Sequence, residues 1–219
     1  MRQVTGAPYS GEHVQESDQP LADGTHLRHS TSTTFYRDSE GRVRSEWTLF
    51  PLGPENPESL TMVSISDPVA HALYTLDSIN KVVHRQELRV SAPETQPRAA
   101  GPSSTVVQPE GNGKPDVVFE KLGAAVREGL TVEGERKTTI RPVGAWQGND
   151  HPLTEVDETW TSPELRIVVF RRRTNPITGE VIGKVTNINR SEPDAALFQP
   201  PPDYSVVEEA GELTITWGR

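Results

Sequence analysis

The chain is rich in short segments in which apolar and polar residues alternate. Between residues 43 and 49, Val43 and Trp47 fall on one side of such a segment, and Arg44 and Glu46 fall on the other. A period of two is typical of a half-buried antiparallel strand. We therefore expect a strand at 43–49 with Trp47 buried and with Arg44 and Glu46 exposed.

Turn signals separate the alternating segments. Asp23-Gly24 and the segment 38–41 (Asp-Ser-Glu-Gly) favour tight turns, which would join three strands between residues 12 and 50 into a meander. Further strands are expected at 60–66, 70–77, 81–90, 130–141, 155–161, 165–173, 180–189, 204–207 and 213–217. No strand–helix–strand alternation is present, so a mainly β fold is expected. The prediction is one large, curved antiparallel sheet, a half-barrel, with one short helix.

Three segments depart from the strand pattern. Residues 91–116 contain five Pro and three Gly with few large aliphatic residues, which predicts a mobile linker inside a single β domain spanning 1–219. Apolar residues at helical spacing predict the short helix at 119–128. Residues 194–198 allow at most one helical turn. For the tail, 208–219, the sequence offers only a possible edge strand.

Composition excludes several classes of protein. The 219 residues carry a net charge of −9 and no cysteine, which argues against nucleic-acid binding and excludes disulfides and thiolate metal sites. No apolar run approaches the roughly 20 residues of a transmembrane helix. The first residues lack the apolar core of a signal peptide. Either the protein is cytosolic or a signal peptide has been removed. Few Lys among the basic residues, many Thr and Ser, and short strands favour a periplasmic or secreted protein.

Candidate chemistry is sparse. Phosphate-binding, nucleophile-elbow, zinc-protease and calcium-loop motifs are absent, so no cofactor is expected. His26 and His29 are three residues apart, which on a strand places them on opposite faces and argues against a shared metal ion. In the loop before 155–161, Asp150 and His151 are either an acid–base pair or part of a turn.

Strand alternation places four polar side chains on faces that also carry apolar residues: His29, His84, Arg136 and Glu158. Buried charges are costly unless they are paired, so two interpretations remain open. Glu158 and Arg136 could form a structural ion pair while the histidines bond to the backbone. Alternatively, His29, His84 and Glu158 could form a catalytic or metal-binding set.

Two long stretches resemble a known group. Residues 8–92, including "ISDPVAHALYTLD", and residues 120–207 resemble an uncharacterised family of secreted bacterial β-rich proteins. The "W-x-S-P-E-L" step at 160–165 and the "PDAALFQPPPDY" ending at 193–204 also resemble Lol-type lipoprotein carriers and related sigma-factor regulators. That resemblance implies an eleven-strand half-barrel whose concave face holds lipid or acyl chains.

The resulting hypothesis is a binding protein that takes a lipid or another apolar or amphipathic molecule on one sheet face. We expect Phe35, Trp47 and Trp160 to line the groove and Arg136 to meet an anionic head group. One alternative is a metal-assisted hydrolase that uses His29, His84 and Glu158, or Asp150 and His151. Another alternative is an envelope protein–protein interaction module that uses exposed strand edges.

Overall fold

The computed structural model describes residues 3–49, 60–88 and 115–210, and these residues form twelve strands and one 3-10 helix. The elements are β1 (Tyr9–Pro20), β2 (His26–Arg37), β3 (Val43–Leu49), β4 (Leu60–Asp67), β5 (Ala72–Asp77), β6 (Val82–Glu87), β7 (Asp116–Arg127), β8 (Leu130–Arg141), β9 (Leu153–Ser162), β10 (Ile167–Asn175), β11 (Gly179–Asn189), η1 (Ala195–Phe198) and β12 (Ser205–Glu208).

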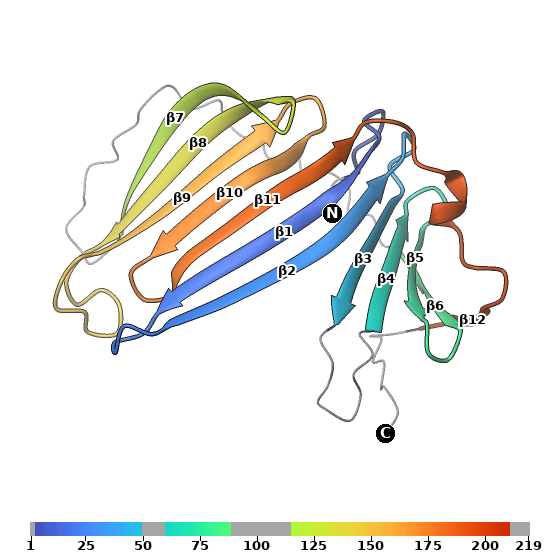
Figure 1. Cartoon of the computed structure of the whole chain (residues 1–219), viewed down its shortest axis with the longest axis horizontal. Helices are drawn as coiled ribbons and strands as arrows, with labels where there is room; N and C mark the ends of the chain where they lie inside the picture. Colours follow the sequence, from blue (N-terminus) through green and yellow to red (C-terminus); the bar gives the residue numbers. More distant parts are fainter. Residues whose placement is uncertain (1–2, 50–59, 89–114, 211–219) are drawn as a thin grey trace. The chain divides into compact units, whose positions relative to one another are not determined.

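All twelve strands belong to one sheet, in the order β12-β6-β5-β4-β3-β2-β1-β11-β10-β9-β8-β7 (Figure 1). The pairings from β2 to β6 and from β7 to β11 are antiparallel, whereas β12 pairs with β6 in parallel. The predicted mainly β class with one large, open sheet is confirmed. The strands at 43–49 and 130–141 have the predicted bounds, and the single helical turn near 194–198 is η1. The strand expected at 213–217 lies outside the described residues.

The helix expected at 119–128 is wrong, because this segment is the edge strand β7. It pairs along its length with β8, and the register shifts between Lys121 and Gly123. Such a bulge inserts one residue and changes which side chains face each way, which disturbs a strand's period of two. Gly123 has φ +82°, a conformation that glycine adopts without strain. The bulge therefore explains why the apolar residues of β7 are spaced as they would be on a helix.

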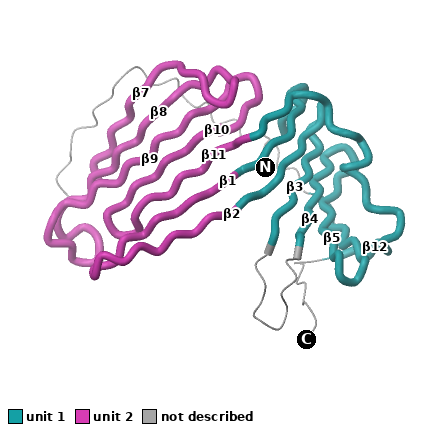
Figure 2. The backbone as a smooth tube through the Cα atoms, viewed as in Figure 1, with its two compact units in different colours: residues 1–13, 32–95, 187–219 teal, residues 14–31, 96–186 magenta. Residues whose placement is uncertain are grey.

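The chain divides into two compact units (Figure 2). Unit 1 comprises residues 1–13, 32–95 and 187–219, and unit 2 comprises residues 14–31 and 96–186. Most of the predicted linker at 91–116 lies outside the described residues. That 1–219 forms one domain stays a prediction.

The core of unit 1 lies between η1 and the strands β4, β5 and β6. Phe198 of η1 is 1% exposed and packs in a cluster of four strand residues, Val63, Ile65, Leu76 and Val83. The Asp194 carboxylate caps η1 by accepting a hydrogen bond from the Ala196 backbone N–H.

The predicted orientation of β3 is wrong. Arg44 and Glu46 lie opposite Ile65 and Val63 of β4, on the face that holds the core. The Arg44 side chain is only 15% exposed, and its Nη1 donates to the Leu197 backbone oxygen at 3.0 Å. Trp47, on the other face of β3, is only partly buried. The apolar residues of β4 decide which face is buried, and the pattern of β3 alone does not contain that information.

Candidate functional site

In unit 2, the sheet register aligns a row of charged side chains across neighbouring strands. The partners in this charged row are Glu120 on β7, Arg136 on β8, Glu158 on β9, Arg172 on β10 and, at its end, Ile182 on β11. Directly opposed residues in a sheet share a face, so these side chains lie side by side. The charge alternates in sign along the first four, and each carboxylate lies beside a guanidinium.

A second row crosses the same strands, two positions further along on β8 to β11 and three on β7, where the bulge adds one residue. It contains Gly123, Gly134, Trp160, Phe170 and Lys184, and we call it the aromatic row. Residues two apart on a strand share a face. The charged row and the aromatic row therefore lie on one face of the sheet, which we call the Trp160 face.

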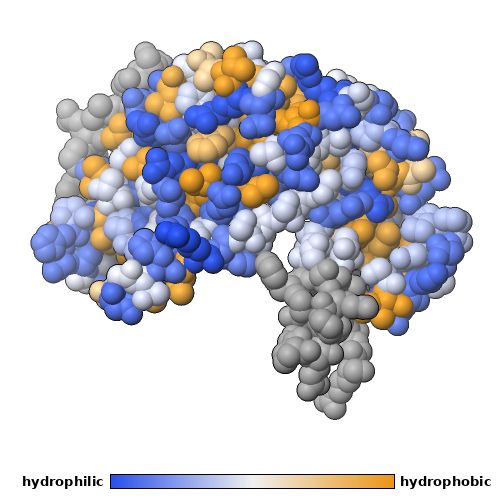
Figure 3. Space-filling view, viewed as in Figure 1, coloured by the Kyte–Doolittle hydropathy of each residue, from blue (hydrophilic) through white to orange (hydrophobic). Residues whose placement is uncertain are grey.

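The Trp160 face is the more buried side of β8. Leu130, Val132 and Gly134 are buried, whereas the residues between them are exposed. In Figure 3, hydrophilic and hydrophobic residues intermingle over unit 2 on the side shown and do not separate into large patches.

Arg136 is held by two carboxylates. Its Nη2 donates to Glu158 at 3.0 Å and its Nη1 donates to Glu120 at 3.1 Å. Glu158 also accepts a hydrogen bond from Trp160 Nε1 at 2.7 Å, and this bond, together with Arg136, holds the pKa of Glu158 below its ordinary value. The hydrogen bond to Glu158 raises the pKa of Arg136. The ion-pair interpretation of Arg136 and Glu158 is confirmed.

Arg127, at the end of β7, lies over the aromatic row. Its guanidinium carbon is 4.6 Å from the centre of the Trp160 ring and 4.4 Å from that of Phe170. These distances allow cation–π attraction to both rings. The Arg127 Nε is buried and has no hydrogen-bond partner.

A groove of about 400 Å³ runs along β11, β1 and β2 in unit 2. It is lined by Glu16, Ser17, Asp18, Arg28, His29, Ser30, Glu180 and Ile182. Since Ile182 ends the charged row, the groove adjoins the Trp160 face. Its three carboxylates are each paired, Glu16 with Lys184, Glu180 with Arg172, and Asp18 with His26 and Arg28. Hydrogen bonds from His26 and then Arg28 lower the pKa of Asp18.

The structure does not bring the predicted metal set together. His29 lines the groove, Glu158 lies in the charged row, and His84 belongs to unit 1, where its Nδ1 lies 2.7 Å from the Glu209 carboxylate. Three strands separate β2 from β9, and three separate β2 from β6. Within the described residues, no group of three or more His, Asp or Glu side chains could hold a metal ion. The alternation of apolar and polar residues indicates which side chains of one strand share a face. It does not indicate which strands are neighbours in the sheet.

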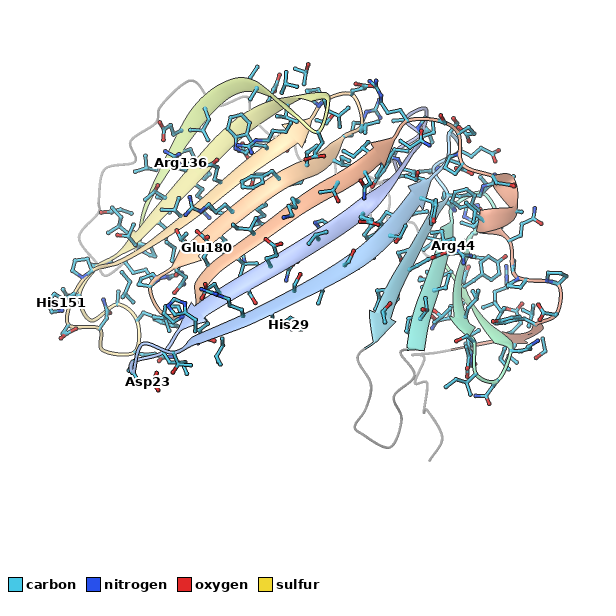
Figure 4. All side chains as sticks on the ribbon, in the orientation of Figure 1. Asp23, His29, Arg44, Arg136, His151 and Glu180 are labelled. Atoms are coloured by element: carbon cyan, nitrogen blue, oxygen red, sulfur yellow. The ribbon has the colours of Figure 1, made fainter. Side chains whose placement is uncertain are left out.

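Asp150 and His151 are adjacent in the loop between β8 and β9, where Figure 4 labels His151. Their side chains approach to 3.0 Å but are 91% and 85% exposed. Asn149 organises this loop, because its side chain bonds to the backbone of Pro142, Trp146 and His151. The geometry is that of a side-chain-stabilised turn.

The four expected ligand-binding residues form two pairs, one in each unit. Phe35 and Trp47 are diagonal neighbours on β2 and β3 of unit 1, opposite Ser45 and Thr33 respectively. Arg136, labelled in Figure 4, and Trp160 share the Trp160 face of unit 2. The sequence interpretation missed Arg127, Phe170 and Asp18. Asp18 could have been suspected, because it lies across the Asp23-Gly24 turn from His26 and Arg28.

No protein-family profile matches the chain, and no curated protein matches it. Solved structures do match. A chain of the Pseudomonas aeruginosa MucA/MucB complex is 11% identical over 94% of this chain, with a TM-score of 0.44, and the match spans only 59% of that longer chain. LprF from Mycobacterium bovis is 12% identical, with 91% of each chain covered and a TM-score of 0.33.

The LolA superfamily protein NE2245 from Nitrosomonas europaea is 7% identical, with 90% of this chain and 92% of that chain covered and a TM-score of 0.35. In the described part of the chain, no helix is long and apolar enough to cross a membrane.

Proposed function

We propose that the chain is a periplasmic or secreted binding protein that holds a lipid or another amphipathic molecule on the Trp160 face of unit 2. The observation that carries the proposal is the position of an aromatic row beside a charged row on one face. The described residues of unit 2 contain strands and turns but no helix or second sheet to cover that face. A sheet face with apolar residues normally packs against a second layer, and a bound ligand can take that place.

The two rows suit the two ends of an amphipathic molecule. Trp160 is 8% exposed and Val132 is fully buried, so a hydrocarbon or ring system would reach the aromatic row by displacing the Arg127 side chain that lies over Trp160 and Phe170. Glu120, Arg136, Glu158 and Arg172 form the adjoining charged row, with two charges of each sign. An anionic head group would bind Arg136 by replacing one of its two carboxylates, since a guanidinium binds two oxygens at once.

Titration with a fluorescent fatty acid tests the proposal. We expect saturable binding by the full chain and at least a tenfold loss of affinity for Trp160→Ala. Trp146→Ala is the matched control, because Trp146 lies in the loop between β8 and β9 and is partly exposed. Circular dichroism must show that both variants are folded. Absence of binding, or equal affinity in the two variants, would contradict the proposal.

Arg136→Ala tests the head-group assignment separately. Its loss leaves Glu120 and Glu158 without their shared cation, so the site becomes more negative. The affinity for an anionic fatty acid should fall more than the affinity for its neutral methyl ester. Equal losses of affinity for the two probes would show that Arg136 does not bind the head group. That result would not contradict the assignment of the apolar site.

A further inference from the structure

β12 is attached to unit 1 in an unusual way. It pairs in parallel with β6, whereas the pairings from β2 to β6 are antiparallel. Ser205 N–H donates to the Lys81 carbonyl at 3.0 Å, and Glu209 N–H donates to the Arg85 carbonyl at 2.8 Å. A parallel ladder uses alternate residues, so Val207 N–H occupies the donor position between them.

The side chains of β12 contribute little to packing. All four residues of β12 are exposed, and Val206 and Val207 are 52% and 42% exposed. Only Tyr204, just before the strand, packs against the core of unit 1. Burial of apolar side chains is the main source of stability, so β12 is held mostly by its backbone bonds.

The remaining contacts of β12 and its flanking residues are made by polar side chains. Lys81 Nζ lies 2.8 Å from Asp203, Arg85 Nη1 lies 2.9 Å from Glu208, and His84 Nδ1 lies 2.7 Å from Glu209. The Lys81–Asp203 and Arg85–Glu208 pairs are exposed or partly exposed, and such pairs contribute about 0–1 kcal/mol each, whereas the His84–Glu209 contact is largely buried. An edge that carries Lys81, His84 and Arg85 thus holds an acidic strand through backbone bonds and polar side chains, with little burial of the β12 side chains.

We propose that the edge of β6 is an interaction surface for an extended acidic segment of a partner protein. The segment would replace β12, run parallel to β6, and present two apolar residues followed by two acidic residues. Addition of a strand to a sheet edge is a common mode of peptide recognition, in which the backbone supplies affinity and side chains supply specificity. While β12 occupies the edge, it lowers the apparent affinity for the partner.

A matched pair of proline variants of the full chain tests this surface. Val207→Pro removes a ladder donor and should release β12, whereas Val206→Pro removes an N–H at the alternate position, which does not bond to β6. Hydrogen exchange at residues 203–210 should rise in the first variant only. A fluorescent peptide with the sequence of residues 203–210 should bind Val207→Pro at least tenfold more tightly than Val206→Pro.

Two further peptides test the stated chemistry. One replaces each Val by Ile and each Glu by Asp, and it should bind like the first. The other replaces both Glu residues by Lys, and it should bind only when Arg85→Glu is added to Val207→Pro. The proposal would be overturned if Val207→Pro does not release β12 or if the released variant does not bind the peptide. It would also be overturned if the affinity does not depend on the charge of the peptide.

Discussion

Gly134 lies directly beneath the Trp160 ring. A Cβ at this position would come within 2.7 Å of the ring carbon Cζ3, closer than such atoms approach in real structures. Gly134 lies opposite Trp160 in the register, so the ring covers the glycine and cannot move away without leaving the aromatic row. The packing of the Trp160 ring therefore requires glycine at position 134.

We predict that Gly134→Ala destabilises the protein by about 1–3 kcal/mol, the range for overpacking a well-filled site. Chemical denaturation measures the change in the free energy of unfolding. In the Trp160→Ala background the same substitution should cost much less, because the obstructing ring is gone. Equal costs in the two backgrounds would mean that the ring does not lie over Gly134.

Glu158 should make stability depend on pH. Its pKa in the folded chain lies below its ordinary value of 4.5, first because of the hydrogen bond from Trp160 and then because of Arg136. The unfolded chain therefore takes up this proton at a higher pH than the folded chain does. The stabilisation is complete above the unfolded pKa and is lost as the pH falls through the folded pKa.

Melting temperatures between pH 2 and pH 7 test this prediction. Glu158→Gln should flatten the acid side of the profile, since glutamine does not ionise. Glu133→Gln, an exposed position on the other face of β8, serves as the control. An acid profile that is unchanged by Glu158→Gln would contradict the role assigned to this carboxylate.

At the scale of elements, η1 contributes Phe198 to the core of unit 1. Phe198 is almost fully buried among residues of β4, β5 and β6, so Phe198→Ala should cost about 3–5 kcal/mol, as for other buried aromatic residues. Trp47→Ala should cost less, because Trp47 is only partly buried. Denaturation of the two variants measures both values. A larger loss for Trp47→Ala would place the core of unit 1 on the other face of β3.

Local patterns predicted the strands well because alternation and turn residues act within a few positions. The bounds of 43–49 and 130–141 were correct, and Arg136, Glu158 and Trp160 were placed on faces that carry apolar residues. Two kinds of feature could not be predicted. The bulge at Gly123 disturbed the spacing in β7, and the buried face of β3 depended on its partner β4.

The candidate site shows the same limit. The row of Glu120, Arg136, Glu158 and Arg172 depends on the register of four strands, which no single strand encodes. The sequence interpretation did not place Arg127 in the site, because it predicted a helix for the segment that contains Arg127. Its position over Trp160 and Phe170 becomes visible only when β7 is paired with β8.

At the scale of the whole chain, the strands of the two halves interleave in the sheet order. Cleavage between β6 and β7 would give one fragment with β1 to β6 and another with β7 to β12. The sheet order then joins the fragments twice, through β1 with β11 and through β6 with β12.

The composition of 91–116 predicts that trypsin cuts there first; of its two basic residues, Arg98 is the expected site, because Lys114 precedes Pro115 and trypsin cleaves Lys–Pro bonds poorly. After this cut, the two fragments should elute together in size-exclusion chromatography without denaturant, because β1 and β12 each bind a strand of the other fragment. Mass spectrometry identifies the first cut. A first cut elsewhere, or separate elution of the fragments, would contradict the prediction.

The most direct test of the central claim is photo-crosslinking of the full chain with a fatty acid that carries a diazirine near its methyl end. Mass spectrometry of the digested protein then locates the label. Binding on the Trp160 face predicts labels on β8, β9 and β10, at residues of the aromatic row and at Val132, and their loss when unlabelled fatty acid is added in excess. Labels confined to unit 1 around Phe35 and Trp47, or labels that excess fatty acid does not displace, would contradict it.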